Sequence, residues 1–462
     1  MTSDEGSRRM APGPLHGVRV LEFSQIIAGP LAGTLLGDLG ADVVKVEPPG
    51  GAGRAPAGAP PAMSKMFQFL NRGKRSLVVN LGDPQGRELI HRIAPTFDVV
   101  IINFRPEVIR RLQIDYETLV RFRPDLIYAQ ISGFGSHGPR VDEPLIDMVA
   151  QAYSGYMAEI GVIDEFGGPM GTHGGTIDAA TALSTVVGVT SALYHRDRSG
   201  EGQFIDVALL RSAMVLIGAL LSQGADGDSA VADPRVEEAH EGYARGDDYA
   251  SVLRAYKATR PAPGRPSDER KAPSSVQPPA DDPTPDNRVV VAHSSIRGPF
   301  LAGYMAKDGP IFIGAYTPVM RALAREALGI PDDGSDEPGA DPFAPDVRAR
   351  VARTRQLLVE KVRNRTVAEI VRELLDAGVP VGPVYLPGEV ADDPQAAELM
   401  VEVEDDLNGP QRQLGGIFEM SKSAVRPAGP APPLGGHTDE VLREAGLSGD
   451  EIAALREAGA VN

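Results

Sequence analysis

The chain has 462 residues, no cysteine and a formal net charge of −17. Its length suffices for two substantial cores, and the lack of cysteine excludes disulfides, thiol nucleophiles and cysteine-ligated metals. The acidic balance argues against a nucleic-acid partner. The sequence has no run of about 18 apolar residues, so no membrane span is predicted. The first ten residues lack the apolar core of a signal peptide. We therefore expect a cytoplasmic protein with a disordered tail over residues 1–14.

Short apolar strands alternate with helical segments over the first 132 residues. Strands are predicted at 18–23, 42–46, 77–80, 99–102 and 126–132, and helices at 29–39, 85–94 and 107–112. This alternation predicts parallel βαβ units in an α/β fold, with ligands at the carboxyl ends of the strands. No G-x-G-x-x-G follows the first strand, where Ala28-Gly29-Pro30 stands instead, so no dinucleotide site is predicted.

The segment from Asp178 to Leu210 combines a carboxylate, an apolar helix, a tight turn at 199–203 and a strand. An Asp at a helix start lies near the positive end of the helix dipole, which favours the ionised form. An ionised carboxylate is a nucleophile toward activated acyl groups. The local sequence alone leaves a second interpretation open, in which Asp178 only caps the helix.

Residues 222–288 are dense in Pro, Gly, Ser, Asp and Ala, which predicts a flexible insert that acts as a linker or a mobile flap. One helix is expected within it, at 247–257. A smaller domain is expected over 289–395, with a strand at 310–314 and helices at 318–328, 346–363 and 367–377.

The Asp178 segment resembles the nucleophile segment of the family III CoA-transferases. In that pattern an Asp opens a helix of small residues, and a Gly-x-Gly-Gln turn and a strand follow without a gap. Further family motifs occur in order along residues 15–220 and 300–460, and the motifs are Gly17–Phe23, Ala28-Gly29-Pro30, Leu36–Glu47, Asn71–Ser76, Asn103–Pro106, Ile131–Gly135, Ala192-Leu193, Arg196, Gly200–Gln203, Gly378–Val384 and Pro433–Thr438.

This resemblance implies a Rossmann-like large domain over 15–221 and a smaller α+β domain over 289–395. It also implies a C-terminal segment, 396–462, that returns to the large domain, and a ring-shaped subunit in an interlocked homodimer. The implied activity moves CoA from an acyl-CoA thioester to a free carboxylic acid. Asp178 would be the nucleophile, through aspartyl anhydride and thioester intermediates, with coenzyme A as the substrate carrier and no metal.

The resemblance also assigns residues to CoA binding. These are Ala28, Val79, Asn80, Leu81, Asn103, Phe104, Arg105, Arg111 and Asp147. Because CoA carries several phosphate charges, an acidic protein needs a concentrated basic patch to hold it. Two clusters qualify, and either one is alternatively a solvated surface: Arg72, Lys74 and Arg75, and Arg105, Arg110 and Arg111.

Several positions depart from formyl-CoA transferase. Ile27, Pro48, Pro144 and Ile146 replace its Gln, Arg, Lys and Tyr, and the nearest candidate for its Gly-rich loop, residues 293–299, has one glycine. These changes argue against a formyl/oxalate substrate pair and favour a larger or more apolar acyl group.

Two other functions remain open. An α-methylacyl-CoA racemase needs a base on each face of the α-carbon, but Ile146 stands where racemases of this family have a His, which leaves only His173 nearby in sequence. A CoA-ester-binding protein without turnover is the other alternative, supported by the missing loop and the long insert.

Overall fold

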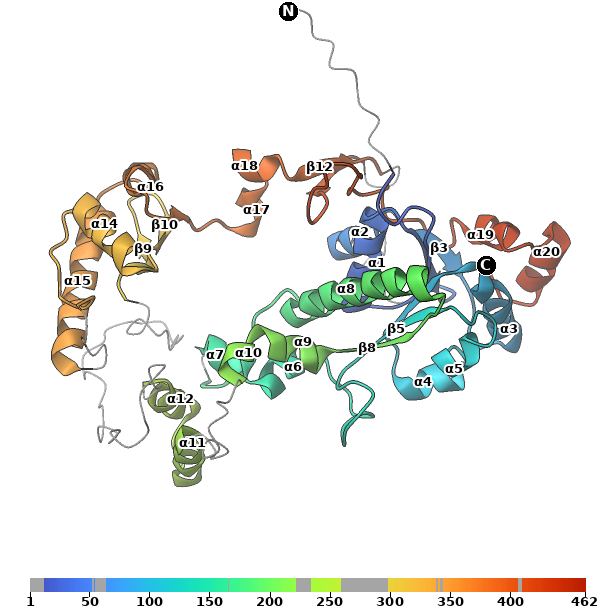
Figure 1. The fold of residues 1–462 in the computed structure, drawn as a ribbon, viewed down its shortest axis with the longest axis horizontal. Coiled ribbons are helices and arrows are strands. Elements are labelled where there is room, and N and C mark those ends of the chain that lie inside the picture. Colours follow the sequence, from blue (N-terminus) through green and yellow to red (C-terminus); the bar gives the residue numbers. More distant parts are fainter. Residues whose placement is uncertain are drawn as a thin grey trace, which may run out of the picture. The chain divides into compact units, whose positions relative to one another are not determined.

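The computed structural model describes residues 12–51, 54, 64–164, 166–221, 234–258, 298–337, 340, 344–405 and 409–462. The chain divides into two compact units (Figure 1). Unit 1 comprises residues 1–162, 169–231 and 398–462, and unit 2 comprises residues 163–168 and 232–397.

A six-stranded sheet forms the centre of unit 1, with strand order β3-β2-β1-β4-β5-β8. Every neighbouring pair is parallel, which confirms the predicted α/β class. The strands are β1 (Arg19–Phe23), β2 (Asp42–Glu47), β3 (Arg75–Val78), β4 (Val99–Ile102), β5 (Ile127–Ser132) and β8 (Phe204–Ala208).

Helices cover both faces of this sheet, so successive strand residues are buried on opposite sides. Val99 and Ile101 of β4 lie in one core, and Val100 and Ile102 lie in the other. The first core holds α1 (Ala28–Asp38), α6 (Asp147–Ser154), α8 (Thr176–Ser199) and α9 (Leu209–Leu216). The second holds α3 (Pro84–Ile93), α4 (Pro106–Arg111), α5 (Tyr116–Leu119), α19 (Thr438–Glu444) and α20 (Gly449–Glu457).

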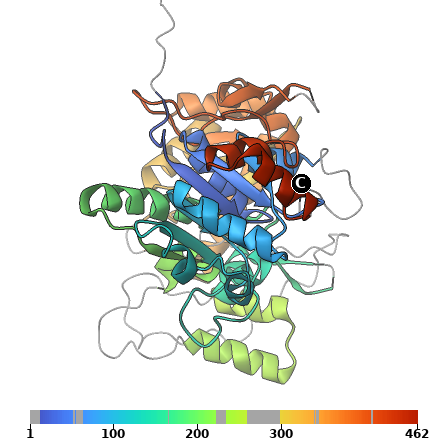
Figure 2. The same ribbon diagram turned by 90° about the vertical axis from the view of Figure 1, so that its right-hand side faces the viewer.

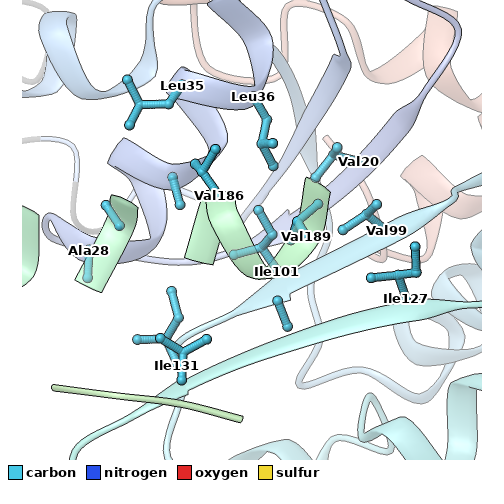
Figure 3. Close-up of a cluster of buried hydrophobic side chains, with 14 of the residues drawn as sticks. Val20, Ala28, Leu35, Leu36, Val99, Ile101, Ile127, Ile131, Val186 and Val189 are labelled. Atoms are coloured by element: carbon cyan, nitrogen blue, oxygen red, sulfur yellow. The ribbon is translucent and has the colours of Figure 1, made fainter. Parts of the chain in front are cut away.

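Helix α8 is the long helix of the first core. Its Val186 and Val189 pack among side chains of the sheet and of α1 (Figure 3). By length and composition alone α8 is apolar enough to cross a membrane, with a mean hydropathy of 1.3, and 44% of that window is buried inside the structure. Because β8 runs parallel to β5 and follows α8 through a short turn, α8 begins at the edge where the strands end.

The C-terminal residues belong to unit 1 and contact the edge strand β3; their helices are drawn in red beside the blue strands in Figure 2. His437 Nδ1 accepts the N–H of Ser76 at 3.3 Å, and Thr438 Oγ1 accepts that of Val78 at 3.2 Å. Val79 then forms a bridge with Val461. Side chains and tail backbone therefore satisfy donors that an edge strand would otherwise expose.

Unit 2 has its own core around an antiparallel sheet of order β11-β10-β9. Its elements are α11 (Pro234–Arg245), α12 (Tyr249–Ala258), β9 (Leu301–Met305), β10 (Pro310–Gly314), α14 (Pro318–Leu328), α15 (Pro345–Arg363), α16 (Val367–Asp376), β11 (Val381–Pro383), α17 (Pro387–Val390) and α18 (Pro394–Ala397). Unit 1 also has short elements: α2 (Lys65–Asn71), a 3-10 turn (Ala94–Thr96), α7 (Tyr156–Ile160), α10 (Gly218–Leu221), β12 (Met400–Val403) and β13 (Gln411–Leu414). A hairpin of β6 (Val162–Ile163) and β7 (Pro169–Met170) stands between α7 and α8.

The predicted insert contains two helices in its described part, where one was expected. Helix α12 covers the predicted segment, and it packs against α11, which was missed. Pro234 at the first position of α11 is a typical helix start, and it was the available signal in this Pro-rich stretch. The rest of the predicted insert, residues 222–233 and 259–288, lies outside the described residues, as does the proposed loop at 293–297.

Candidate active site

The predicted site residues gather at the carboxyl edge of the unit 1 sheet, where ligands are expected in such folds. Val79 follows β3 directly, and Asn103 follows β4. Residues 24–27 follow β1 and form a loop, here called the β1–α1 loop, that leads into Ala28 at the start of α1. The structure thus brings together segments that are far apart in the sequence.

Asp178 lies in the first turn of α8 and is not its cap. Helix α8 begins at Thr176 after Gly175, whose φ of 72° lies in the left-handed region, so the N-cap interpretation is wrong. The capping acceptor comes from α6 instead. Asp147 Oδ2 accepts the N–H groups of Ile177 at 2.7 Å and Asp178 at 3.0 Å. The start of α8 is therefore fixed while the carboxylate of Asp178 takes no part in capping.

Gln151 holds Asp147 in place. Its Nε2 donates to Asp147 Oδ1 at 2.5 Å and to the carbonyl of Thr172 at 3.0 Å. Its Oε1 accepts the N–H of Thr172 at 2.8 Å. Both oxygens of Asp147 are engaged within the protein, so the contacts favour a structural role for this residue over the expected contact with CoA.

Burial raises the pKa of Asp178 to about 6, and the charge of Asp147 adds to that effect. This direction is opposite to the one expected from the helix dipole alone. The dipole favours the ionised form, but loss of solvation and a neighbouring carboxylate favour the protonated form more strongly. Among the described residues no side chain donates a hydrogen bond to the carboxylate of Asp178, which leaves it available for a ligand.

The β1–α1 loop lies against the residues that precede Asp178. A Cβ built on Gly175 would lie 2.7 Å from Ile27 Cδ1 and 3.5 Å from Asp178 Cβ. Ile26 in this loop has a φ of 69° and is exposed. A β-branched residue in the left-handed region costs about 1–3 kcal/mol and persists only where its surroundings enforce it.

Asn103 supplies part of that enforcement. Its Oδ1 accepts the N–H of Gln25 at 3.0 Å, and its Nδ2 donates to the carbonyl of Gln25 at 2.8 Å. The side chain expected to contact CoA thus holds the loop beside it, and Ala28 itself is buried in the first core.

A cavity of about 220 Å³ opens beside this loop at the ends of β1 and β2. Its walls are mainly apolar, and the charged side chains that line it, Lys45, Glu47 and Arg54, are buried and held in ion pairs. The lining residues are Ser24, Gln25, Ile26, Pro30, Lys45, Val46, Glu47, Pro48, Arg54, Ser64, Met66, Phe67, Leu70 and Asn71. Of these residues, the sequence analysis had connected only Pro48 with the acyl group, as a departure from formyl-CoA transferase, and it assigned none of them to CoA binding. The signal was available, because Glu22 and Lys45 are charged residues inside apolar strands.

The two basic clusters have different surroundings. Arg105 and Arg111, at the two ends of α4, are exposed, and in the described part of the chain neither forms an ion pair. Arg110, the third member of that cluster, is also exposed and lies 4.0 Å from Asp142 Oδ1. Phe104 packs partly against the second core. Arg72 and Lys74 are instead buried and paired with carboxylates. The alternative of a phosphate patch at residues 72–75 is therefore wrong.

The segment 79–81 is fixed mainly through its backbone. Val79 is buried, and the N–H of Asn80 donates to the carbonyl of Ala460 at 2.9 Å. Leu81 packs against the second core. No group of three or more His, Cys, Asp or Glu side chains suited to a metal occurs among the residues that the structure describes.

Comparisons with known proteins identify the family of this chain. The sequence pattern of CoA-transferase family III matches residues 15–258 and 280–438. A succinyl-CoA:mesaconate CoA-transferase of Haloarcula marismortui is 31% identical over 453 residues, which cover 94% of this chain and 97% of the relative. A succinyl-CoA:glutarate CoA-transferase of Mus musculus is 29% identical over 93% of this chain and 86% of the relative.

Solved structures show the same likeness. A hypothetical protein from Mycobacterium tuberculosis superimposes with a TM-score of 0.67 and 26% identity, over 93% of this chain and 99% of that one. The family match covers well over half of the chain, and the chain therefore belongs to CoA-transferase family III and is a CoA-transferase.

Proposed function

We propose that Asp178 is the nucleophile that carries the acyl group and then CoA during transfer. The observation that supports this most strongly is a half-buried carboxylate without a hydrogen-bond donor at the carboxyl edge of the sheet, beside the β1–α1 loop. A pKa of about 6 leaves this carboxylate ionised in about nine molecules of ten at pH 7. It is also more basic than an ordinary aspartate, which makes it a better nucleophile.

The transfer consists of four successive acyl exchanges, and in each one a bond to the acyl carbon forms while another breaks. An oxygen of Asp178 attacks the thioester carbonyl, the C–S bond breaks, and a mixed anhydride and CoA thiolate form. The thiolate attacks the aspartyl carbonyl of the anhydride, which releases the donor carboxylate and leaves an aspartyl-CoA thioester. The acceptor carboxylate then attacks that thioester, and a second thiolate attack on the acceptor carbonyl restores Asp178 and yields the new acyl-CoA.

Each tetrahedral intermediate needs donors for its oxyanion. The N–H groups of Ile177 and Asp178 are taken by Asp147, and that of Ala179 donates to the carbonyl of Gly175, so these three groups in the first turn of α8 are already engaged. In the described part of the chain the N–H groups of Ala28 and Gly29 donate to no other residue. We assign the oxyanion site to them, where one lost donor costs roughly 3–4 kcal/mol.

The basic side chains and the backbone edge suit CoA itself. Arg105 and Arg111 are free for the phosphates, and residues 79–81 offer a rigid edge for the adenine. Relatives that match over nearly the whole chain are named for succinyl-CoA as donor and for dicarboxylic acceptors. We propose succinyl-CoA as the donor and a dicarboxylic acid as the acceptor.

We also propose a cytoplasmic homodimer of interlocked rings. Its support in unit 1 is a stripe of exposed apolar side chains on the outer face of α8, formed by Leu183, Val187 and Tyr194, which in a dimer would be covered. Light scattering after size-exclusion chromatography gives the mass; a monomer at micromolar concentration would contradict the dimer.

The nucleophile is tested with Asp178→Asn. We expect transfer between succinyl-CoA and dicarboxylic acids to fall by at least a thousandfold while CoA-ester binding is kept. Mass spectrometry of the wild type after incubation with succinyl-CoA should show an acyl or CoA adduct on Asp178. Turnover by the variant close to the wild-type rate would refute the role, and transfer only with monocarboxylic acyl-CoA esters would refute the donor assignment.

A further inference from the structure

Three charged side chains are buried together behind the β1–α1 loop. Glu22 is 0% exposed, Lys45 is 5% exposed and Lys74 is 3% exposed. Glu22 joins the two lysines, since its Oε1 lies 2.8 Å from Lys45 Nζ and its Oε2 lies 2.8 Å from Lys74 Nζ. Removing three charges from water is unfavourable, so such a cluster needs a compensating set of contacts.

Those contacts go to the β1–α1 loop. Lys45 Nζ donates to the carbonyl of Ser24 at 2.7 Å. Ser24 Oγ donates to Glu22 Oε1 at 2.7 Å. The first residue of the loop is therefore held both by its backbone and by its side chain.

The second lysine holds the helix that follows the loop. Lys74 Nζ donates to the carbonyl of Pro30 at 2.7 Å, in the first turn of α1, and to the carbonyl of Leu70 at 2.9 Å, at the end of α2. The space around it is closed, because a Cβ on Gly33 would lie 1.9 Å from Glu22 Oε2. The cluster thus fixes the chain on both sides of residues 25–29.

Residues 25–29 carry the groups that face the reaction in the proposed function. Ile26 has its left-handed backbone there, Ile27 contacts the position of Gly175, and Ala28 and Gly29 hold the free N–H groups. The loop cannot keep this conformation by its own preference, since a β-branched residue disfavours a positive φ. It must be held from outside.

We propose that Glu22, Lys45 and Lys74 are positioning residues for CoA transfer: they hold the β1–α1 loop so that the N–H groups of Ala28 and Gly29 face the thioester beside Asp178. This inference rests on the proposed function. None of the three touches the reacting atoms. Their effect is on the geometry of the oxyanion donors, and therefore on the rate of acyl transfer more than on the affinity for the CoA ester.

The same unit contains a matched control pair. Arg72 and Asp38 are also buried, and Arg72 Nη2 lies 2.6 Å from Asp38 Oδ2. The other hydrogen bonds of Arg72 go to the C-terminal segment, including the carbonyl of Gly415 at 3.1 Å, and its guanidinium lies over the ring of Phe69; none of these contacts goes to the β1–α1 loop. Neutralising Glu22 or Asp38 leaves buried cations without their carboxylate in both cases, but only the loss of Glu22 reaches the loop.

The experiment compares Glu22→Gln with Asp38→Asn in the full-length protein. For each variant the melting temperature, the Kd for succinyl-CoA and the kcat of CoA transfer are measured, at a temperature where both are folded. We expect similar losses in melting temperature, a kcat at least tenfold lower for Glu22→Gln, less than a twofold change in kcat for Asp38→Asn, and little change in either Kd. Equal kcat values for the two variants would overturn the proposal.

Ser24→Ala keeps all three charges and removes only the hydroxyl contact to Glu22, so it serves where Glu22→Gln does not fold. We expect it to keep its melting temperature and to lower kcat at least threefold; an unchanged kcat would overturn the proposal. Asp178→Asn, measured in parallel, separates the two hypotheses. An active Asp178→Asn refutes the nucleophile, whereas an inactive Asp178→Asn with Glu22→Gln equal to Asp38→Asn refutes only the positioning.

Discussion

Two groups of basic residues in unit 1 offer a comparison between charges that build the fold and charges that remain free for a ligand. Arg72, Lys74 and Arg75 lie on the turn into β3. Arg105 and Arg111 lie at the two ends of α4. The first group is surrounded by carboxylates from α1, β1, β2 and α19, while the second forms no ion pair with any described residue.

The difference lies in what the neighbouring segments contribute. Asp38, Glu22 and Asp42 come from the first β-α-β unit, and each meets one of the three basic residues. Next to α4 only Arg110 meets a carboxylate among the described residues, in an exposed contact of 4.0 Å with Asp142 Oδ1. A cation is therefore available to a phosphate only where the fold has not already neutralised it, and a basic run in the sequence does not show which case applies.

The largest effect is expected for Arg72→Ala. Its removal leaves Asp38 buried without its partner, which should lower the free energy of unfolding by about 3–5 kcal/mol. Urea unfolding measures this change. Arg92→Ala, which breaks the exposed pair with Glu451, is the control and should leave the free energy of unfolding almost unchanged. Equal losses would show that burial does not separate the two kinds of charge.

Asp178→Asn should stabilise the folded protein although it abolishes transfer. The pKa of this carboxyl is raised from 3.8 to about 6 in the folded state, so the folded state binds the proton more tightly and loses stability as the pH rises from about 4 to about 6. An Asn carries no such cost. We expect a gain of about 1–3 kcal/mol at pH 8 that shrinks toward pH 4.5, and a gain independent of pH would contradict the raised pKa.

Much of this fold follows from local sequence. Strand 99–102 and helix 318–328 were predicted with their observed bounds, because apolar runs and a Pro at the helix start act locally. The pairing of residues 72–75 could not be predicted, since their partners come from α1, from other strands and from α19. The pKa of Asp178 was predicted in the wrong direction, because its burial, the larger cause, and the nearby charge of Asp147 both arise only in the tertiary fold.

The sequence did contain one unused signal for the site. Glu22 lies in the apolar strand RVLEF and Lys45 in DVVKVE, and a charge on a buried strand needs a partner. Gln151 gave no such signal, since a glutamine on a helix is ordinary. Its role follows only from its hydrogen bonds to the backbone of Thr172, which the tertiary fold brings next to α6.

Arg111→Ala tests whether the exposed arginines at the ends of α4 bind CoA. If Arg111 meets a phosphate of CoA, its loss should weaken succinyl-CoA binding by about 1.5–3 kcal/mol, the range for hydrogen bonds to charged groups. The effect should shrink at high salt, because the contact is exposed and screened. Arg121→Ala, another exposed arginine of unit 1, is the control. Isothermal titration calorimetry at two salt concentrations measures the Kd of each variant for succinyl-CoA. Equal Kd values for the two variants at low salt would show that Arg111 does not contact CoA.

The smallest effect is expected for Asp147→Asn, and it extends the comparison from cations to carboxylates. Asp147 is engaged through both oxygens, whereas Asp178 is not.

In the wild type kcat/KM should fall as the pH drops below about 6, because only the ionised Asp178 attacks the thioester. An Asn at position 147 still offers one oxygen to the backbone N–H groups but no charge. Burial, the larger cause of the raised pKa, remains. The fall in kcat/KM should therefore move to a lower pH without reaching the range of an ordinary aspartate. The pH profile of transfer from succinyl-CoA measures this shift, and a profile that moves to higher pH would show that Asp147 does not act on Asp178 through its charge.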